Sequence, residues 1–211
     1  MTAVRAAQTP VNGLPTLGLL AGGRGTRLGG VDKAWLVRDG LPQVLRFARR
    51  FSGETGPVLV SANGDLQRYA EAGLQAVVDR LDPGSGPLAG IDALAAACST
   101  EWLLILPVDL FDVNDCLLRT LASGATGNGA LAEDDDGLQP LVALYRCEAL
   151  RRELPAMIAE GDLAPRNLAR RLGLSRVRLM GVRFGNLNTP RDLATACMEL
   201  PRPSGDPTGP E

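Results

Sequence analysis

The 211-residue sequence contains no histidine. This absence excludes Ser-His-Asp and Cys-His catalytic arrangements, an imidazole general base and zinc sites with histidine ligands. Lysine is almost as scarce, because Lys33 is the only lysine among 22 Lys and Arg residues. Any chemistry must therefore depend on carboxylates, arginines, backbone amides, this one lysine and, where one binds, a metal.

Other features are missing as well. No apolar run reaches the roughly 18 residues that a membrane-spanning helix requires, and the N-terminal stretch lacks the apolar core of a secretory signal. The net charge of −2 argues against a nucleic acid or a membrane surface as the main partner. With 45% hydrophobic residues the chain is typical of a globular protein, which we expect to be soluble and cytoplasmic.

The four cysteines are far apart in the sequence and form no C-x-x-C pair. In a chain without an export signal we expect them to be reduced thiols in apolar surroundings, with a disulfide as the less favoured alternative. They are Cys98, Cys116, Cys147 and Cys197.

The length fits one domain that can bury a full core. We expect a flexible N-terminus over residues 1–13, a single domain over residues 14–200 and a disordered tail over residues 201–211. The tail, PRPSGDPTGPE, is rich in proline and glycine, a composition that favours disorder.

Strand-like apolar runs and helical spacings alternate along the first 120 residues, which predicts a three-layer α/β/α fold around a mostly parallel sheet. Strands are expected at 16–20, 57–62, 76–78 and 102–106, and helices at 42–51, 66–72, 88–98 and 115–122. The remainder predicts strands at 129–132, 141–145 and 176–180, and helices at 148–159, 165–172 and 191–200.

Polar groups follow three of the predicted strands. A glycine-rich loop follows the first strand, Asn63 follows the second, and Asp109 follows the apolar run WLLIL. Ligands of open parallel sheets bind at the carboxyl ends of the strands. The sequence therefore predicts a binding site at this edge.

The glycine-rich loop has the composition of a phosphate-binding loop. Gly22, Gly23 and Gly25 let the backbone approach a ligand closely, while Arg24 and Arg27 add positive charge. The loop matches neither the P-loop pattern nor the GxGxxG dinucleotide fingerprint. A loop of solvated arginines without a ligand remains the alternative.

Lys33 lies just behind this loop. An ammonium group is a compact point charge, which suits a site that must place one cation against a phosphate. The alternative is that a single lysine has survived by chance in a chain that otherwise uses arginine.

The segment LAGGRGTRLGGVDKAWL resembles the N-terminal signature of the molybdenum cofactor guanylyltransferases, the MobA family. The motifs VLVSAN, VVD, GPLAG, PVD and NLNTP continue the resemblance, in the family's order, over residues 16–196. It implies a nucleotide-diphospho-sugar transferase-like (Rossmann-like) fold and transfer of GMP from GTP to Mo-molybdopterin, with release of pyrophosphate. It also implies Mg²⁺ as cofactor, and a GTP-binding adaptor protein and molybdoenzyme acceptors as further partners.

The resemblance also implies roles for individual residues. Asp109 is expected to hold Mg²⁺ against the phosphates, although Leu110 and Phe111 depart from the family pattern and leave the loop shape open. The residues expected to be catalytic are Lys33, Asp109 and Arg27. The residues expected to bind the nucleotide are Leu20, Ala21, Gly22, Gly23, Arg24, Lys33, Asn63, Asp79 and Asp109. The residues expected on the pterin side are Asn186, Asn188 and Arg166.

Several of these residues also have a plain structural alternative. Asp109 suits a helix N-cap or a turn, and Asn63 with Gly64 is a common turn pair. The acidic run at 133–136 is expected to be a solvated hairpin tip, and the arginine pairs at 151–152 and 170–171 to be charge on helix surfaces.

Three other functions stay open. The loop GGRGTRL also resembles the start of the sugar-nucleotide pyrophosphorylases, which are usually longer and carry a Pro-Lys pair further on. The cytidylyltransferases of the same cofactor resemble LAAG where this chain has LAGG, so Gly22-Gly23 favours guanine. A non-catalytic nucleotide-binding or partner-binding relative is the third alternative.

Overall fold

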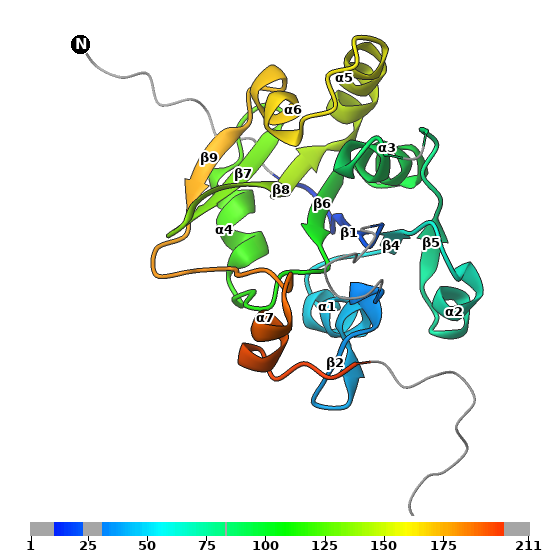
Figure 1. Ribbon diagram of the computed structural model, residues 1–211. Helices are drawn as coiled ribbons and strands as arrows, with labels where there is room; N and C mark the ends of the chain where they lie inside the picture. The colour runs from blue at the N-terminus through cyan, green and yellow to red at the C-terminus, as the bar shows by residue number, and fades with distance from the viewer. Residues whose placement is uncertain (1–10, 23–30, 83, 201–211) are drawn as a thin grey trace, which may run out of the picture.

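The computed structural model describes residues 11–22, 31–82 and 84–200. The expected flexible residues 1–10 of the N-terminus and the tail at 201–211 lie outside this described part, as do Gly23, Arg24 and Arg27. The described residues build a seven-stranded sheet of order β5-β4-β1-β6-β8-β7-β9 (Figure 1). Its strands are β1 (Thr16–Leu20), β4 (Val58–Ser61), β5 (Gln75–Val77), β6 (Trp102–Pro107), β7 (Gly129–Asp134), β8 (Gly137–Arg146) and β9 (Ser175–Arg178).

The sheet is mostly parallel, as predicted. Six of its strands run in the same direction, namely β5, β4, β1, β6, β7 and β9. In the described sheet only β8 runs the opposite way, between β6 and β7. A short two-stranded ribbon, β2 (Val37–Arg38) with β3 (Leu41–Pro42), lies outside this sheet.

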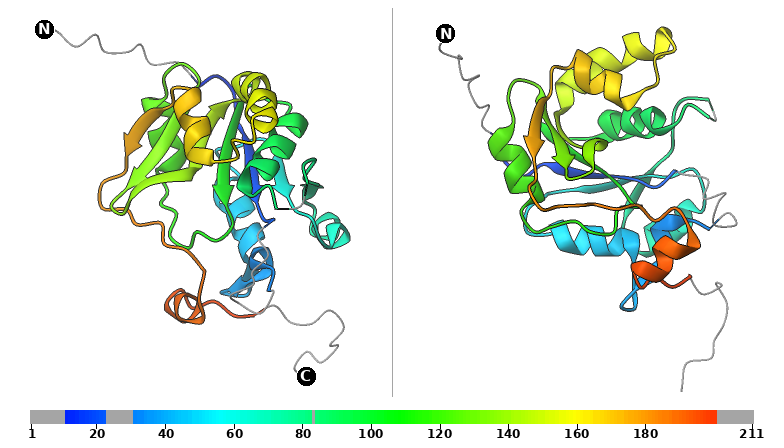
Figure 2. Two further views of the ribbon diagram at one scale, coloured as in Figure 1. Left: turned by 45° about the horizontal axis from the view of Figure 1, so that its top comes forward. Right: turned by 60° about the vertical axis from the view of Figure 1, so that its left-hand side comes forward.

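Helices cover both faces of the sheet (Figure 2). One face packs against α1 (Gln43–Phe51) and α4 (Leu117–Gly124). The other packs against α3 (Pro87–Ala97), α5 (Cys147–Ala159) and α6 (Pro165–Arg171). The remaining helical segments are η2 (Lys33–Trp35), α2 (Leu66–Glu71) and α7 (Pro190–Thr195).

Strand β6 explains why both layers form. Its residues Trp102, Leu104 and Leu106 belong to the core on one face, whereas Leu103 and Ile105 belong to the core on the other. Successive side chains of a strand point to opposite faces, so an uninterrupted apolar run requires cover on both sides. The cores on both faces of β6 confirm the three-layer prediction.

The predicted elements are present, but β8 begins four residues before the expected strand at 141–145, and β2, β3 and η2 were not predicted. The clearest difference lies at the end of the chain. The expected helix at 191–200 ends at Thr195. Cys197 has a left-handed backbone with φ of 52°, and Glu199 exchanges backbone hydrogen bonds of 2.8 and 2.6 Å with Val37. The chain leaves the helix because its last described residues pair with the β2 ribbon.

The cysteine prediction is half right. All four cysteines are free thiols, but only Cys98 and Cys147 are buried, whereas Cys116 and Cys197 are exposed. Among the described residues, no helix combines the length and the apolarity needed to cross a membrane.

The prediction of a solvated hairpin tip at 133–136 is wrong for one residue. Asp134 is only 1% exposed, because the β7–β8 tip folds against the segment around Phe184. Burial alone would raise the pKa of Asp134, but hydrogen bonds from Gln139 and from the backbone amides of Phe184, Asp136 and Gly137 outweigh it and lower that pKa.

This lowered pKa predicts a specific acid sensitivity. A carboxyl group with a depressed folded-state pKa stabilises the fold above its unfolded pKa, and this contribution is lost as the pH falls through the folded value. We expect the unfolding free energy to drop more steeply below pH 3.8, the ordinary value for Asp, in the wild type than in Asp134→Asn. Urea unfolding at a series of pH values from 6 downwards measures this, and parallel curves for the two proteins would contradict it.

Candidate functional site

A cavity of about 710 Å³ opens at the carboxyl ends of β1, β4, β5 and β6, where the sequence places its polar clusters. The ends of these strands and the loop into α3 form its walls. The candidate residues that line it are Leu20, Ala21, Gly22, Lys33, Asn63, Asp79 and Asp109.

The motif GPLAG brings α3 against this cavity. Gly86 has φ of 68° and Pro87 occupies the first turn, so the helix begins at the cavity wall. A Cβ at Gly90 would lie 2.6 Å from Ser61 Oγ and 2.7 Å from Leu20 Cδ2. A side chain at this position would force Ser61 or Leu20 to shift, so glycine permits the close approach of the helix to the ends of β1 and β4.

Asn63 and Asp79 form one polar wall of the cavity. Asn63 Nδ2 donates to Asp79 Oδ2 at 2.8 Å, and the Asp79 amide donates to Asn63 Oδ1 at 3.1 Å. Ser61 Oγ donates to the other carboxylate oxygen, Oδ1, at 2.9 Å. Ser61 was not among the predicted site residues, and its only signal was a hydroxyl at the end of the strand in VLVSAN.

Lys33 joins two segments on the opposite wall. Its Nζ donates to Asp109 Oδ2 at 3.1 Å and to Asn188 Oδ1 at 2.6 Å, and its side chain is only 15% exposed. Asp32 fixes the backbone here, because its carboxylate accepts from the Ala34 amide at 2.9 Å and from the Tyr69 hydroxyl at 3.3 Å. Burial raises the pKa of Asp32.

The residues present fit a small, hard cation that is shared with a ligand. Within the described residues no cluster of three or more metal-binding side chains is found. Asp109 uses Oδ2 toward Lys33, and no described protein group hydrogen-bonds its Oδ1. Because Mg²⁺ is commonly held by one or two carboxylates together with phosphate oxygens, this single carboxylate at a cavity is a suitable donor.

The loop after Asp109 has a defined shape despite Leu110 and Phe111. Leu110 is buried, and its carbonyl accepts from Gln43 Nε2 at 2.5 Å. The Phe111 ring fills the space beside Gly185, where a Cβ would collide with it. Phe111 departs from the family pattern, and Gly185 on the neighbouring segment leaves the space that its ring occupies.

The other expected residues lie away from the cavity walls. Asn186 is exposed and accepts, through its carbonyl, a 3.1 Å hydrogen bond from the Asn188 amide. Arg166 is exposed on α6 and is not among the described residues that line the cavity. Their contribution to substrate binding stays a prediction.

An ion pair between an exposed arginine and a buried carboxylate supports the cavity wall. Arg80 follows Asp79, and its guanidinium binds both carboxylate oxygens of Asp92 on α3, at 2.9 and 2.8 Å. The Asp92 side chain is 7% exposed and that of Arg80 is 58% exposed. The pair ties the residue next to Asp79 to the helix on the other side of the loop.

Arg80→Ala is expected to lower the unfolding free energy by about 1–3 kcal/mol, because a buried carboxylate would lose its bidentate partner. Chemical denaturation measures the loss. Arg183→Ala, which removes the exposed pair with Asp136, is the matched control and is expected to change stability by less than about 0.5 kcal/mol. Equal losses in the two variants would contradict this assignment.

Comparisons with known proteins identify the family of the chain. Residues 18–177 match the family described as the MobA-like NTP transferase domain. A molybdenum cofactor guanylyltransferase of Pseudomonas aeruginosa is 36% identical over 181 residues, which cover 83% of this chain and 91% of the relative. A relative of the same name from Cereibacter sphaeroides is 37% identical, with 84% and 93% covered.

Solved structures of nucleotidyltransferases share the fold. The molybdopterin-guanine dinucleotide biosynthesis protein A of Archaeoglobus fulgidus has a TM-score of 0.62 at 23% identity, covering 86% of this chain and 96% of that one. A 2-C-methyl-D-erythritol 4-phosphate cytidylyltransferase of Thermus thermophilus has a TM-score of 0.61 at 20% identity, covering 87% and 96%. These neighbours confirm the nucleotide-diphospho-sugar transferase-like fold. Since the family match and the relatives both extend over most of its length, the chain belongs to the MobA-like NTP transferase family.

Proposed function

We propose that the chain is a molybdenum cofactor guanylyltransferase, which transfers GMP from GTP to Mo-molybdopterin and releases pyrophosphate. One observation carries this proposal: Lys33, Asp109 and Asn188, from three separate motifs, meet beside a cavity whose other wall holds Asn63 and Asp79. The names of relatives at 36% and 37% identity support it.

The chemistry suits a chain without histidine. A phosphate oxygen of molybdopterin forms a bond to the α-phosphorus of GTP while the bond to the bridging oxygen of the β-phosphate breaks, so that pyrophosphate leaves. The attacking phosphate is already an anion near neutral pH and needs no general base. The protein must instead align the two substrates and neutralise their charge, which is the usual requirement in phosphoryl-type transfer.

The cationic and amide groups of the site suit the phosphates. Lys33 would place its ammonium against the triphosphate, while the backbone after β1, from Leu20 to Gly23, would approach the phosphates closely. Arg24 and Arg27 would add charge from the same loop. Bound Mg²⁺ would neutralise phosphate charge as a Lewis acid, and Asp109 is the residue that would hold it.

The remaining groups would recognise the rest of the two substrates. Asn63 and Asp79 would hold the guanosine part, because an amide and a carboxylate together offer both donors and acceptors. Asn186, Asn188 and Arg166 would serve the pterin side. A GTP-binding adaptor protein and molybdoenzyme acceptors complete the proposed partners.

Pyrophosphate release with Mg²⁺ and Mo-molybdopterin, compared between GTP and CTP, tests this function. We expect release with GTP alone. Release with CTP alone would assign the chain to the cytidylyltransferases. Release with a sugar 1-phosphate in place of molybdopterin, or nucleotide binding without any release, would also overturn the proposal.

A further inference from the structure

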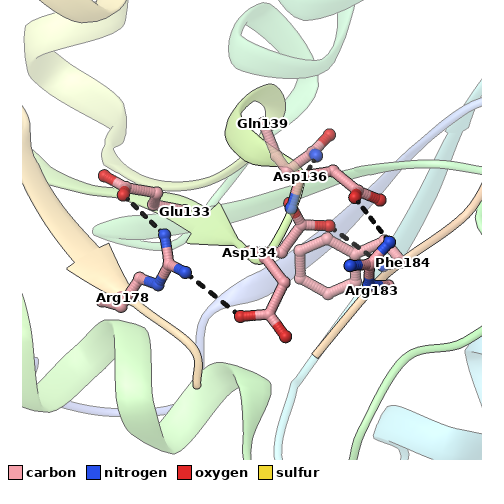
Figure 3. Close-up of polar contacts among 8 residues, drawn as sticks. Glu133, Asp134, Asp136, Gln139, Arg178, Arg183 and Phe184 are labelled. Carbon is pink, nitrogen blue, oxygen red and sulfur yellow. Dashed lines mark hydrogen bonds and ion pairs between the residues drawn. The ribbon is translucent and has the colours of Figure 1, made fainter. Parts of the chain in front are cut away.

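Asp134 is a buried carboxylate that the proposed reaction does not use. It lies at the tip of the β7–β8 hairpin, and Figure 3 shows the polar groups around it. One of its oxygens, Oδ1, accepts from the Asp136 amide and from Gln139 Nε2, both at 2.9 Å. The other oxygen, Oδ2, accepts from the Phe184 amide at 3.0 Å.

The neighbouring acidic residues are paired differently. Arg178 binds Glu133 at 2.8 Å and Asp135 at 3.1 Å, and Arg183 binds Asp136 at 3.0 Å. No described cation forms an ion pair with Asp134, and its charge is balanced by hydrogen bonds alone. The bonds from Asp136, Gln139 and the Gly137 amide stay within the hairpin, and the bond from Phe184 crosses to the neighbouring segment.

Phe184 begins the segment that reaches the candidate active site. Its carbonyl accepts from the amides of Phe111 and Asp112, in the loop after Asp109, at 3.3 and 3.1 Å. Three residues further on, the Leu187 amide donates to the Asp109 carbonyl at 2.8 Å. Asn188 comes next, and its side chain accepts from Lys33.

We propose that Asp134 is a positioning residue, which anchors the segment 184–188 so that Asn188 meets Lys33 beside Asp109. This inference rests on the proposed function, because that function makes the contact between Asn188 and Lys33 part of an active site. The bond from the Phe184 amide to Asp134 holds the start of the segment. The backbone bond from Leu187 to Asp109 fixes the position of its other end relative to the loop after β6. A shift of the segment would move Asn188 relative to Lys33 without altering either residue.

Asp134→Asn is the sharpest variant, because it removes one bond selectively. If the asparagine oxygen keeps the bonds within the hairpin, its Nδ2 must face the Phe184 amide, and two donors cannot bond to each other. Asp136→Asn is the matched control. It alters the same hairpin, but its carboxylate is 53% exposed and pairs with Arg183, which is 70% exposed.

The expected result concerns both activity and coupling. We expect Asp134→Asn to lower kcat/KM for pyrophosphate release about tenfold, because small displacements at a reacting centre strongly reduce rates. Asp136→Asn should stay within about twofold of wild type. In an Asn188→Ala background, Asp134→Asn should cause no further loss of kcat/KM, while it lowers the Tm as much as in the wild-type background.

Additive losses of kcat/KM in the double variant would overturn the inference, because Asp134 would then act on activity independently of Asn188. An effect of Asp136→Asn as large as that of Asp134→Asn would overturn it too. Should Asp134→Asn fail to fold, Gln139→Ala removes one donor to the same carboxylate and should show the same coupling with a smaller loss.

Hydrogen exchange separates this inference from the proposed function. Amides in the segment 184–188 should exchange faster in Asp134→Asn than in Asp136→Asn or wild type, since an anchored segment opens less often. If wild type releases no pyrophosphate, the proposed function fails, and this exchange difference alone decides whether Asp134 anchors the segment. Unchanged exchange in Asp134→Asn would overturn the anchoring itself.

Discussion

Asp109→Asn is expected to reduce pyrophosphate release by at least about 10²- to 10³-fold, the range seen when one stabilising group is removed from a transition state. The Asp109 carboxylate lines the cavity beside Lys33, and its Oδ1 has no described protein partner. An amide lacks the negative charge that a divalent cation requires. The substitution also leaves Lys33 without its ion-pair partner.

Titration of Mg²⁺ distinguishes metal binding from other effects of this variant. If Asp109 holds the cation, raising the Mg²⁺ concentration should recover part of the lost rate, whereas wild type saturates at a lower concentration. Asp112→Asn is the matched control, because Asp112 is exposed in the same loop and only its backbone contacts the segment at Phe184. A near wild-type rate for Asp109→Asn would refute the metal role.

Lys33→Arg is expected to lower kcat/KM about 10²-fold although it preserves the charge. The ammonium of Lys33 donates to Asp109 and Asn188 from a position that is only 15% exposed. A guanidinium is larger, planar and fixed in its donor geometry, so it cannot occupy the same point between these two oxygens. Under the proposed function the loss should appear because the cation would be displaced from the phosphate that it is proposed to neutralise.

Lys33→Met separates charge from shape. We expect it to lower kcat/KM at least as much as Lys33→Arg, since it removes the cation altogether. Arg46→Lys is the control for exchange between the two cations, because Arg46 makes an exposed bond to Asp39 and should tolerate the change. Full activity of Lys33→Arg would show that the site requires positive charge without a compact shape, and the scarcity of lysine would then carry no functional meaning.

Local patterns were enough to predict most of the fold. The apolar run in β6 has to be covered on both faces, and the alternation of strands and helices over the first half follows from the period of the side chains. The same patterns placed Asn63 and Asp109 at one edge, because parallel strands end on the same side of their sheet. These features depend on short stretches of sequence, so they can be read without the tertiary structure.

The sequence motifs did not predict which distant side chains and strands contact one another. Ser61 bonds to Asp79 because β4 and β5 are neighbours, and the hydroxyl alone did not indicate this. The α7 helix ends early because Glu199 pairs with Val37, a residue more than 150 positions away. Neither contact can be recognised from the local periodicity of the sequence.

By itself, the sequence determined the alternating layers, the edge of the sheet where the cavity opens, the absence of imidazole chemistry and the single compact cation beside a glycine-rich loop. Only the tertiary structure decided that Asn188 meets Lys33 across 155 positions and that Asp134 turns inward from an acidic run. The reason is physical. Periodicity reports which face of an element is buried, whereas strand order, loop paths and close packing decide which distant side chains share a hydrogen bond.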